Sequence, residues 1–365
     1  MTSKAFGLAQ LGNAFSDGAL SNRNRIINGA MTIDQRNAGA AVTPTEGQYT
    51  VDRWQARLNQ SSKFSIQQNA GAVTPPDGYT KYLGVTSLSS YSPAASDYFA
   101  VVQNIEGFNA ADLGWGTANA QSVTLSFWVR SSLTGTFTIA FINDGFSRGY
   151  VATYTINAAN TWEQKTITLS GDTTGTWQSG SSAGIRVWFT LGFGSSQTTT
   201  PNVWGSFVGI SATGAVSVVG TSGATFYITG VQLEAGDTAT PFEHRSFEQE
   251  LSLCQRYFEK SYNTATAPAT ATYVGILANG GFYAGPTASY GVRVGAQYKV
   301  SKRATPTVTT FDSSGNAGKC NFPDASTNVT MTVIHNGENG FTAETAQVSV
   351  DQTRVYWHYT SSAEL

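Results

Sequence analysis

The sequence has few cysteines, few charged residues and no long apolar run. Its 365 residues include 2 cysteines, Cys254 and Cys320. They fall in different expected domains, so we expect reduced thiols and no disulfide framework. Charged residues make up 12% of the chain, the formal net charge is −2, and no lysine or arginine cluster is present. This charge pattern gives no electrostatic reason to expect nucleic acid as a partner. The first twenty residues resemble neither a secretion signal nor a membrane span, so we expect no membrane insertion.

Motifs for metal, cofactor and catalytic chemistry are also missing. The three histidines stand alone without a second histidine or cysteine at ligand spacing, so we expect no metal. No phosphate loop, dinucleotide turn or nucleophile elbow follows a strand, so we expect no cofactor. A glycosidase needs two carboxylates across a cleft, and sequence alone leaves such a pair open. The usual role of acidic residues in loops is in turns and caps, and the candidates here are Asp97, Glu106, Asp112, Asp144 and Asp172.

Glycine, aromatic and small polar residues are abundant, which is typical of β-structure with many turns. Between residues 25 and 245, strand patterns follow one another at the spacing of a sandwich, and no segment between them has the pattern of a crossover helix. Antiparallel pairing in a jelly-roll β-sandwich is therefore expected. Trp54 lies on the apolar face of one such strand and is predicted to be core. A break at Thr229 and Gly230 predicts a bulge in the last strand.

After this sandwich the apolar period changes from about two to about 3.6, which predicts a linking helix over residues 246–260. A second, smaller β-sandwich is expected over residues 261–365. The predicted fold is therefore all-β, with two sandwiches joined by one helix. Residues 1–24 have too few apolar residues to build a core, so they are interpreted as either a docking tail or a disordered leader.

Two strands carry a matched pattern of tryptophan and arginine. Trp128 and Arg130 lie on one strand, and Arg186 and Trp188 on another, in each case opposite the apolar face. Indole faces stack on sugar rings and guanidinium groups donate to hydroxyls, so these residues are candidates for carbohydrate binding. The alternative is that loops or a second subunit cover them and that they pack as cation–π pairs. A second candidate surface consists of the loop aromatics Tyr98, Trp115, Trp177 and Trp204.

Several blocks of the chain resemble the tail-fibre and receptor-binding proteins of tailed bacteriophages and prophages. They are NRIINGAMTIDQRNAG with YTVDRW, then VTLSFWVRSS, and above all the junction GVQLEAG to LCQRYFEKS, with KRATPTVT downstream. The resemblance spans nearly the whole chain. It implies a virion appendage protein with a jelly-roll domain similar to carbohydrate-binding modules, usually trimeric and attached to other virion proteins through its N-terminal end. It implies location in the virion after assembly in the host cytoplasm, and it supplies no residue-level ligand motif.

Three functions follow from these observations. The first is a non-enzymatic adhesin that binds bacterial surface polysaccharide and gains avidity from several copies. The second is a structural virion joint or decoration protein, and the third is a polysaccharide depolymerase of tailspike type. For the adhesin we expect a homotrimer whose chains meet along the helix. The expected interface residues are Phe247, Leu251, Cys254 and Phe258.

Overall fold

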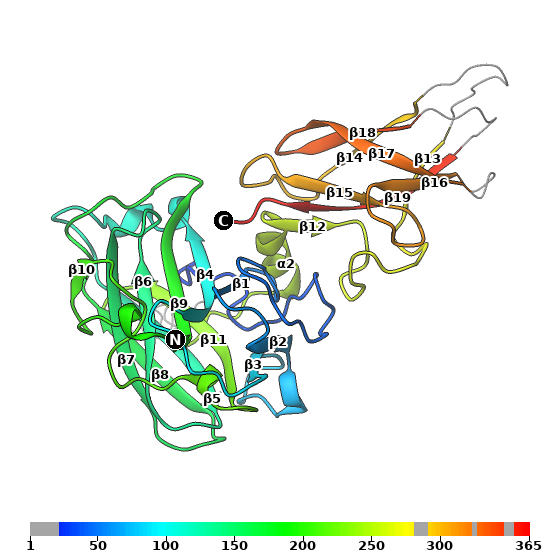
Figure 1. Ribbon diagram of the computed structural model, residues 1–365. Helices are drawn as coiled ribbons and strands as arrows, with labels where there is room; N and C mark the ends of the chain where they lie inside the picture. The colour runs from blue at the N-terminus through cyan, green and yellow to red at the C-terminus, as the bar shows by residue number, and fades with distance from the viewer. Residues whose placement is uncertain (1–21, 281–290, 323–326, 347–353) are drawn as a thin grey trace, which may run out of the picture. The chain divides into compact units, whose positions relative to one another are not determined.

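The computed structural model describes residues 22–280, 291–322, 327–346 and 354–365. The N-terminal segment lies outside the described residues up to residue 21. The described chain divides into two compact units. The first contains the residues before Ile33, residues 39–247 and Leu365, and the second contains residues 33–38 and 248–364. In Figure 1 the strands of the first unit run from blue to yellow-green, and those of the second from yellow to red.

The first unit is a sandwich of two antiparallel sheets (Figure 1). The six-stranded sheet has the order β1 (Trp54–Leu58), β4 (Tyr98–Glu106), β9 (Ala183–Phe193), β6 (Gly135–Ile142), β7 (Arg148–Ile156), β10 (Trp204–Ser206). The five-stranded sheet has the order β2 (Phe64–Gln68), β3 (Leu83–Ser87), β11 (Thr225–Ala235), β5 (Val123–Ser131), β8 (Glu163–Leu169). Short 3-10 helices lie between strands: η1 (Ala70–Ala72), η2 (Gly107–Asn109), η3 (Ala111–Leu113), η4 (Ser195–Gln197) and η5 (Val218–Gly220).

Alternating apolar residues of both sheets form the core of this unit. Phe127 of β5 and Phe189 of β9 meet edge to face, with ring centroids 5.3 Å apart, as expected for side chains from the facing sides of a sandwich. Trp54 is completely buried in the same core, as predicted. The all-β class is also confirmed, because strands dominate the described elements of both units.

The bulge predicted in the last strand of this unit is present in β11. The register against β5 shifts between Thr229 and Gln232, and Gly230 has a φ of +59°. A side chain at Gly230 would be strained by this left-handed backbone and would also collide with the Tyr79 hydroxyl, 2.5 Å from an ideal Cβ. Glycine is therefore required at the bulge.

Residues 22–29 run alongside β11. The amide of Arg25 donates to Leu233 O at 2.9 Å, and the amide of Val231 donates to Gly29 O at 3.0 Å. Asn24 is buried, and its amide donates to the Glu243 carboxylate at 2.7 Å. The sequence predicted that Asn24 belongs to the N-terminal tail. In the structure it is buried among residues of the sandwich.

The second unit consists of the segment 33–38, helix α2 from its second residue onward and an eight-stranded network. Its elements are α2 (Phe247–Gln255), β12 (Phe258–Lys260), β13 (Leu277–Gly280), β14 (Arg293–Gln297), β15 (Thr307–Phe311), β16 (Lys319–Phe322), β17 (Thr327–Asn336), β18 (Gly340–Thr345) and β19 (Arg354–Ser362). Strand β19 pairs with β12, β13, β15 and β16. A core that includes Trp357 and Phe341 lies inside this network.

A buried ion pair lies next to this core. Lys302 Nζ is 2.7 Å from Glu259 Oε2, and neither side chain is exposed to solvent. Glu259 also accepts a hydrogen bond from the Tyr359 hydroxyl at 2.7 Å, and Lys302 donates to Gln255 O at 2.6 Å. Burial lowers the pKa of Lys302, while the Glu259 carboxylate acts in the opposite direction. The pair therefore depends on these hydrogen bonds to offset the cost of removing two charges from water.

The linking helix is shorter than predicted. α2 ends at Gln255, and Phe258 begins strand β12, because residues 258–260 pair with β19. Cys254 is completely buried and Phe258 is 5% exposed within the chain itself, and the Arg36 guanidinium covers the Phe258 ring at 3.8 Å. These two residues are therefore closed to a second chain. Phe247 is exposed and Leu251 is half-buried.

Candidate functional site

The structure brings together three of the four loop aromatics that the sequence singled out. Trp115 follows η3, Trp177 lies in the loop between β8 and β9, and Trp204 opens β10. The ring centroids of Trp115 and Trp177 are 4.8 Å apart, those of Trp115 and Trp204 5.2 Å, and those of Trp177 and Trp204 5.5 Å. All three pairs meet edge to face, which is a favoured geometry for aromatic rings. We call these residues the tryptophan cluster.

The indole nitrogens of the tryptophan cluster are all used in hydrogen bonds to the backbone. Trp115 Nε1 donates to Gln121 O at 2.8 Å, and Trp204 Nε1 donates to Ser170 O at 2.7 Å. Trp177 Nε1 donates to Thr174 O at 3.2 Å. These bonds fix the ring orientations, and they leave the carbon surfaces of the half-buried Trp177 and Trp204 for contact with a ligand.

An ion pair supports the loop that carries Trp177. Asp172 accepts two hydrogen bonds from Arg148, at 2.8 Å each, and lies 3.3 Å from Trp177 Nε1. Burial by itself raises the pKa of Asp172, but the Arg148 guanidinium and the Thr174 amide outweigh it and hold that pKa below its ordinary value. Asp172 is therefore ionised at neutral pH and keeps the loop attached to β7.

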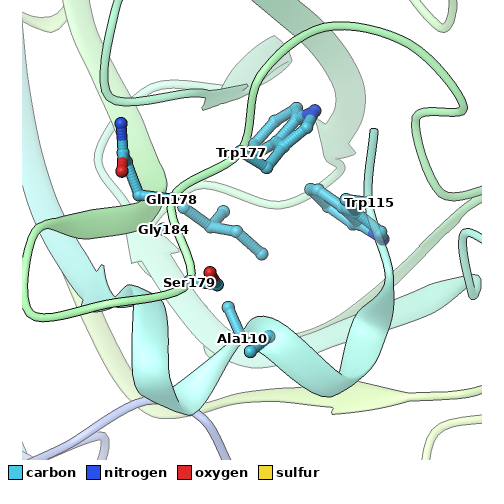
Figure 2. Close-up of a pocket in the computed structure, with 8 residues that line it drawn as sticks. Ala110, Trp115, Trp177, Gln178, Ser179 and Gly184 are labelled. Carbon is cyan, nitrogen blue, oxygen red and sulfur yellow. The ribbon is translucent and has the colours of Figure 1, made fainter. Parts of the chain in front are cut away.

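A small hollow of about 40 Å³ opens beside Trp115 and Trp177. Figure 2 shows the two indoles on one side of it and Gln178 on the other. Gln178 and Ser179 are exposed, and Trp115 is 7% exposed. The complete lining is Ala110, Ala111, Trp115, Trp177, Gln178, Ser179, Gly184 and Ile185. This lining combines an aromatic wall with the exposed Ser179, while the Gln178 carboxamide points away from the indoles.

Close backbone packing shapes the floor of the hollow. The amide of Gly107 donates to Ser182 O at 2.8 Å, and the amide of Phe108 donates to Gly180 O at 2.9 Å. A Cβ at Gly184 would lie 2.8 Å from Gly107 Cα and 3.1 Å from Gln178 O. The loop that contains Gln178 is thus held against η2 and presents a preformed surface.

The two strands with the tryptophan and arginine pattern do not form one face. β5 belongs to the five-stranded sheet and β9 to the six-stranded sheet. Trp128 and Trp188 each lie on the side of their own sheet opposite the core, and the outer faces of a sandwich point away from each other. The shared surface that the sequence suggested for these residues is therefore absent.

Trp188 lies in a cluster on the outer face of the six-stranded sheet. It is 3% exposed, its ring faces the Arg57 guanidinium at 5.0 Å, and Tyr98 and Phe146 lie 6.2 and 6.1 Å away. Arg186 is tied to Asp144 and donates to Asn104 Oδ1 at 2.9 Å. Trp188 therefore packs against arginine in a cation–π contact, which was the alternative to carbohydrate binding. It offers little ring surface to a glycan. Tyr98 remains half-exposed at the rim.

Trp128 and Arg130 lie on the outer face of the five-stranded sheet. Trp128 is half-buried, and its cross-strand neighbours are Thr229 and Gln164. Arg130 lies over the Tyr227 ring at 5.6 Å, and its Nε donates to Asn160 O at 3.0 Å. This part of the sheet is separate from the tryptophan cluster.

Three of the carboxylates considered for acid–base chemistry are ion-paired. Asp112 pairs with Arg25, Asp144 with Arg186 and Asp172 with Arg148. Asp97 accepts hydrogen bonds from the Tyr91 hydroxyl at 2.6 Å and the Ala94 amide at 2.8 Å. Within the described residues, no group of three or more metal-ligating side chains is found. No helix in the described part of the chain is both long and apolar enough to cross a membrane.

The second unit contains larger hollows. One of about 370 Å³ is lined by residues of β13 and β14, including Asn279 and Gln297, and by Tyr359. Tyr359 is 3% exposed and its hydroxyl is bound to Glu259, so its ring is not open for stacking. The aromatic stacking surface that a sugar requires is better provided by the tryptophan cluster.

No family model matches the chain, and no curated protein matches it. The solved structures similar to it include carbohydrate-binding modules and a phage tailspike domain. The enzymatically active domain of bacteriophage CBA120 tailspike protein 4 is 12% identical, covers 56% of this chain and 22% of its own, and has a TM-score of 0.30. A family 11 carbohydrate-binding module from Clostridium thermocellum is 10% identical, and the match has a TM-score of 0.29. It covers 55% of this chain and 98% of the module. A protein from Bacteroides thetaiotaomicron described as sugar-binding is 12% identical, and the match has a TM-score of 0.34. It covers 59% of this chain and 100% of that protein.

Sequence reasoning missed the polar residues and the floor of the hollow. Gln178 and Ser179 lie in a stretch of glycine and serine that carries no periodic signal, and Gly184 lies at the start of the strand that became β9. The nearest sequence signal was Trp177, one residue before this stretch. Arg57 and Phe146, which cover Trp188, were also missed because their strand and loop are far from β9 in sequence.

Proposed function

We propose that this chain is a virion appendage protein that adheres to bacterial surface glycans without altering them chemically. The observation that carries the proposal is the tryptophan cluster with its hollow. Half-buried indoles held in fixed orientations offer apolar faces to sugar rings, and the neighbouring Ser179 offers a hydrogen-bond donor and acceptor to hydroxyls. Sites of this kind bind through shape and stacking, and several copies per particle raise the avidity.

The proposal also includes attachment of the protein to the virion and its association into a trimer. The tail-fibre resemblance favours attachment to other virion proteins through the N-terminal segment, and it favours a homotrimer. The ion pairs of Asp112, Asp144 and Asp172 favour adhesion over a depolymerase, because a carboxylate tied to arginine is poorly suited to exchange protons with a substrate.

Replacing Trp177 with alanine is expected to reduce binding to bacterial polysaccharides by about tenfold or more, because a stacking face is worth about 1–3 kcal/mol. Binding is measured on an array of purified bacterial surface polysaccharides, with circular dichroism to check the fold. Wild-type protein incubated with the same polysaccharides should release no new reducing ends.

Two variants serve as controls for this experiment. Trp128→Ala removes a half-buried indole on the five-stranded sheet, and Gln297→Ala alters the hollow of the second unit. Both should bind as wild type. Loss of binding in either, with Trp177→Ala unaffected, would move the site to that surface. New reducing ends would establish the depolymerase instead.

For the trimer, Leu251→Asp is expected to convert a trimer into a folded monomer, as measured by mass in solution. Phe247 is 48% exposed and Leu251 half-buried, so α2 retains apolar surface that a second chain can bury. Ser252→Asp places the same charge at an exposed neighbouring position of α2 and should leave the mass unchanged. A wild-type protein that is monomeric would refute the trimer.

A further inference from the structure

We infer that the hollow beside Trp115 and Trp177 receives the acetamido group of an N-acetylated sugar. The inference rests on the proposed glycan binding and specifies its substrate class. The observations behind it are the volume of the hollow, the apolar character of its inner wall and the polar character of its outer edge.

The volume excludes a whole sugar ring. A protein cavity that accommodates benzene measures about 150 Å³, whereas one that holds a single water molecule needs only about 10–15 Å³. The hollow measures about 40 Å³, so it has room for a substituent of the size of a methyl or acetyl group. The ring that carries the substituent must remain outside.

The inner wall is suited to a methyl group. It consists of the Trp115 and Trp177 rings, Ile185, Ala110 and the bare backbone of Gly184. The indole nitrogens donate to backbone carbonyls elsewhere, so they offer no polar atom to a ligand. A hydroxyl or a charged amine placed against these indole and aliphatic surfaces would lose hydrogen bonds to water that the surfaces do not replace, so this part of the wall selects against both.

The outer edge distinguishes an amide from a plain methyl group. Ser179 is exposed beside the hollow, and its hydroxyl supplies a donor and an acceptor as partners for an amide C=O and N–H. The Gln178 carboxamide points away from the indoles (Figure 2). The methyl group of a 6-deoxy sugar would fill the same space but leave the Ser179 hydroxyl to water. With the methyl inside, the sugar ring lies outside beside the half-buried Trp177.

The inference is tested with the full-length chain by saturation-transfer NMR. The probes are three matched pairs of monosaccharides at millimolar concentration: N-acetylglucosamine with glucose, N-acetylgalactosamine with galactose, and N-acetylmannosamine with mannose. At least one N-acetyl sugar should bind about tenfold more tightly than its parent sugar, because one apolar group in a fitted pocket discriminates by at least that factor. Its acetyl methyl protons should receive the strongest saturation.

The variant Ser179→Leu places a larger side chain at the exposed edge of the hollow and should abolish the preference for the N-acetyl sugar. Ser61→Leu, at an exposed loop position between β1 and β2, is the matched control and should retain it. Ring protons more saturated than the methyl, a stronger response from L-fucose or L-rhamnose, or an unchanged Ser179→Leu would overturn the inference. In each of these cases Trp177-dependent polysaccharide binding would still stand. If no sugar or polysaccharide binds, both the inference and the proposed function fail.

Discussion

Replacing Lys302 with methionine is expected to lower the free energy of unfolding of the second unit by about 3–5 kcal/mol, because the change leaves a buried carboxylate without its counter-charge. Glu259 and Lys302 are both closed to solvent and 2.7 Å apart. Glu259 would keep the Tyr359 hydroxyl and the Lys299 amide as partners. Two hydrogen bonds offset only part of the cost of a buried negative charge.

Urea unfolding of the full chain, followed by tryptophan fluorescence and circular dichroism, measures this change. Lys299→Met removes an exposed lysine from the same loop and should change the unfolding free energy by less than about 0.5 kcal/mol. The double variant Glu259→Leu with Lys302→Met should recover part of the loss, since no unpaired charge remains. A single variant as stable as wild type would show that the pair is hydrated in solution.

The second large effect is expected for Trp188→Ala, which should destabilise the first unit by about 3–5 kcal/mol. The indole is 3% exposed and lies between Arg57, Tyr98 and Phe146, so its removal leaves a cavity and uncovers two aromatic rings. Its Nε1 has no hydrogen-bond partner among the described residues, so the loss comes from packing and the cation–π contact alone.

Trp128→Ala is the matched control for this measurement, because it removes the same side chain from an outer sheet face where it is only half-buried. Its loss should lower the free energy of unfolding by less than about 1.5 kcal/mol. Equal losses in the two variants would mean that Trp188 is no better packed than Trp128, contrary to its exposure in the structure.

These two tryptophans also show how far sequence reasoning reaches. Period-two alternation predicted the strands that contain them and assigned both side chains to the face opposite the apolar residues. Both assignments are confirmed, as are the core position of Trp54 and the bulge at Gly230. Alternation reports only which side of its own strand a residue occupies. Two strands from opposite sheets of a sandwich therefore give identical patterns, and the shared face inferred from them was wrong.

The candidate site was only partly accessible to sequence reasoning for a related reason. The loop tryptophans were identified as a group, and three of them do meet. The hollow itself depends on contacts between residues 107–115 and 177–185, which are distant in sequence and have no periodicity.

The end of the helix was also mispredicted. The apolar spacing continued through Phe258, but pairing of β12 with β19 is stronger than the local helical preference, so the helix ends at Gln255.

The pairing of β19 has a consequence for how the chain is made. β19 follows β12, β13, β15 and β16 in sequence and is hydrogen-bonded to all four. During translation these four strands emerge from the ribosome before their common partner exists, and they expose unpaired edges until residue 362 has been synthesised. Strands β16, β17, β18 and β14 can pair with one another before β19 is made. The second unit as a whole, however, cannot be completed until β19 has been synthesised.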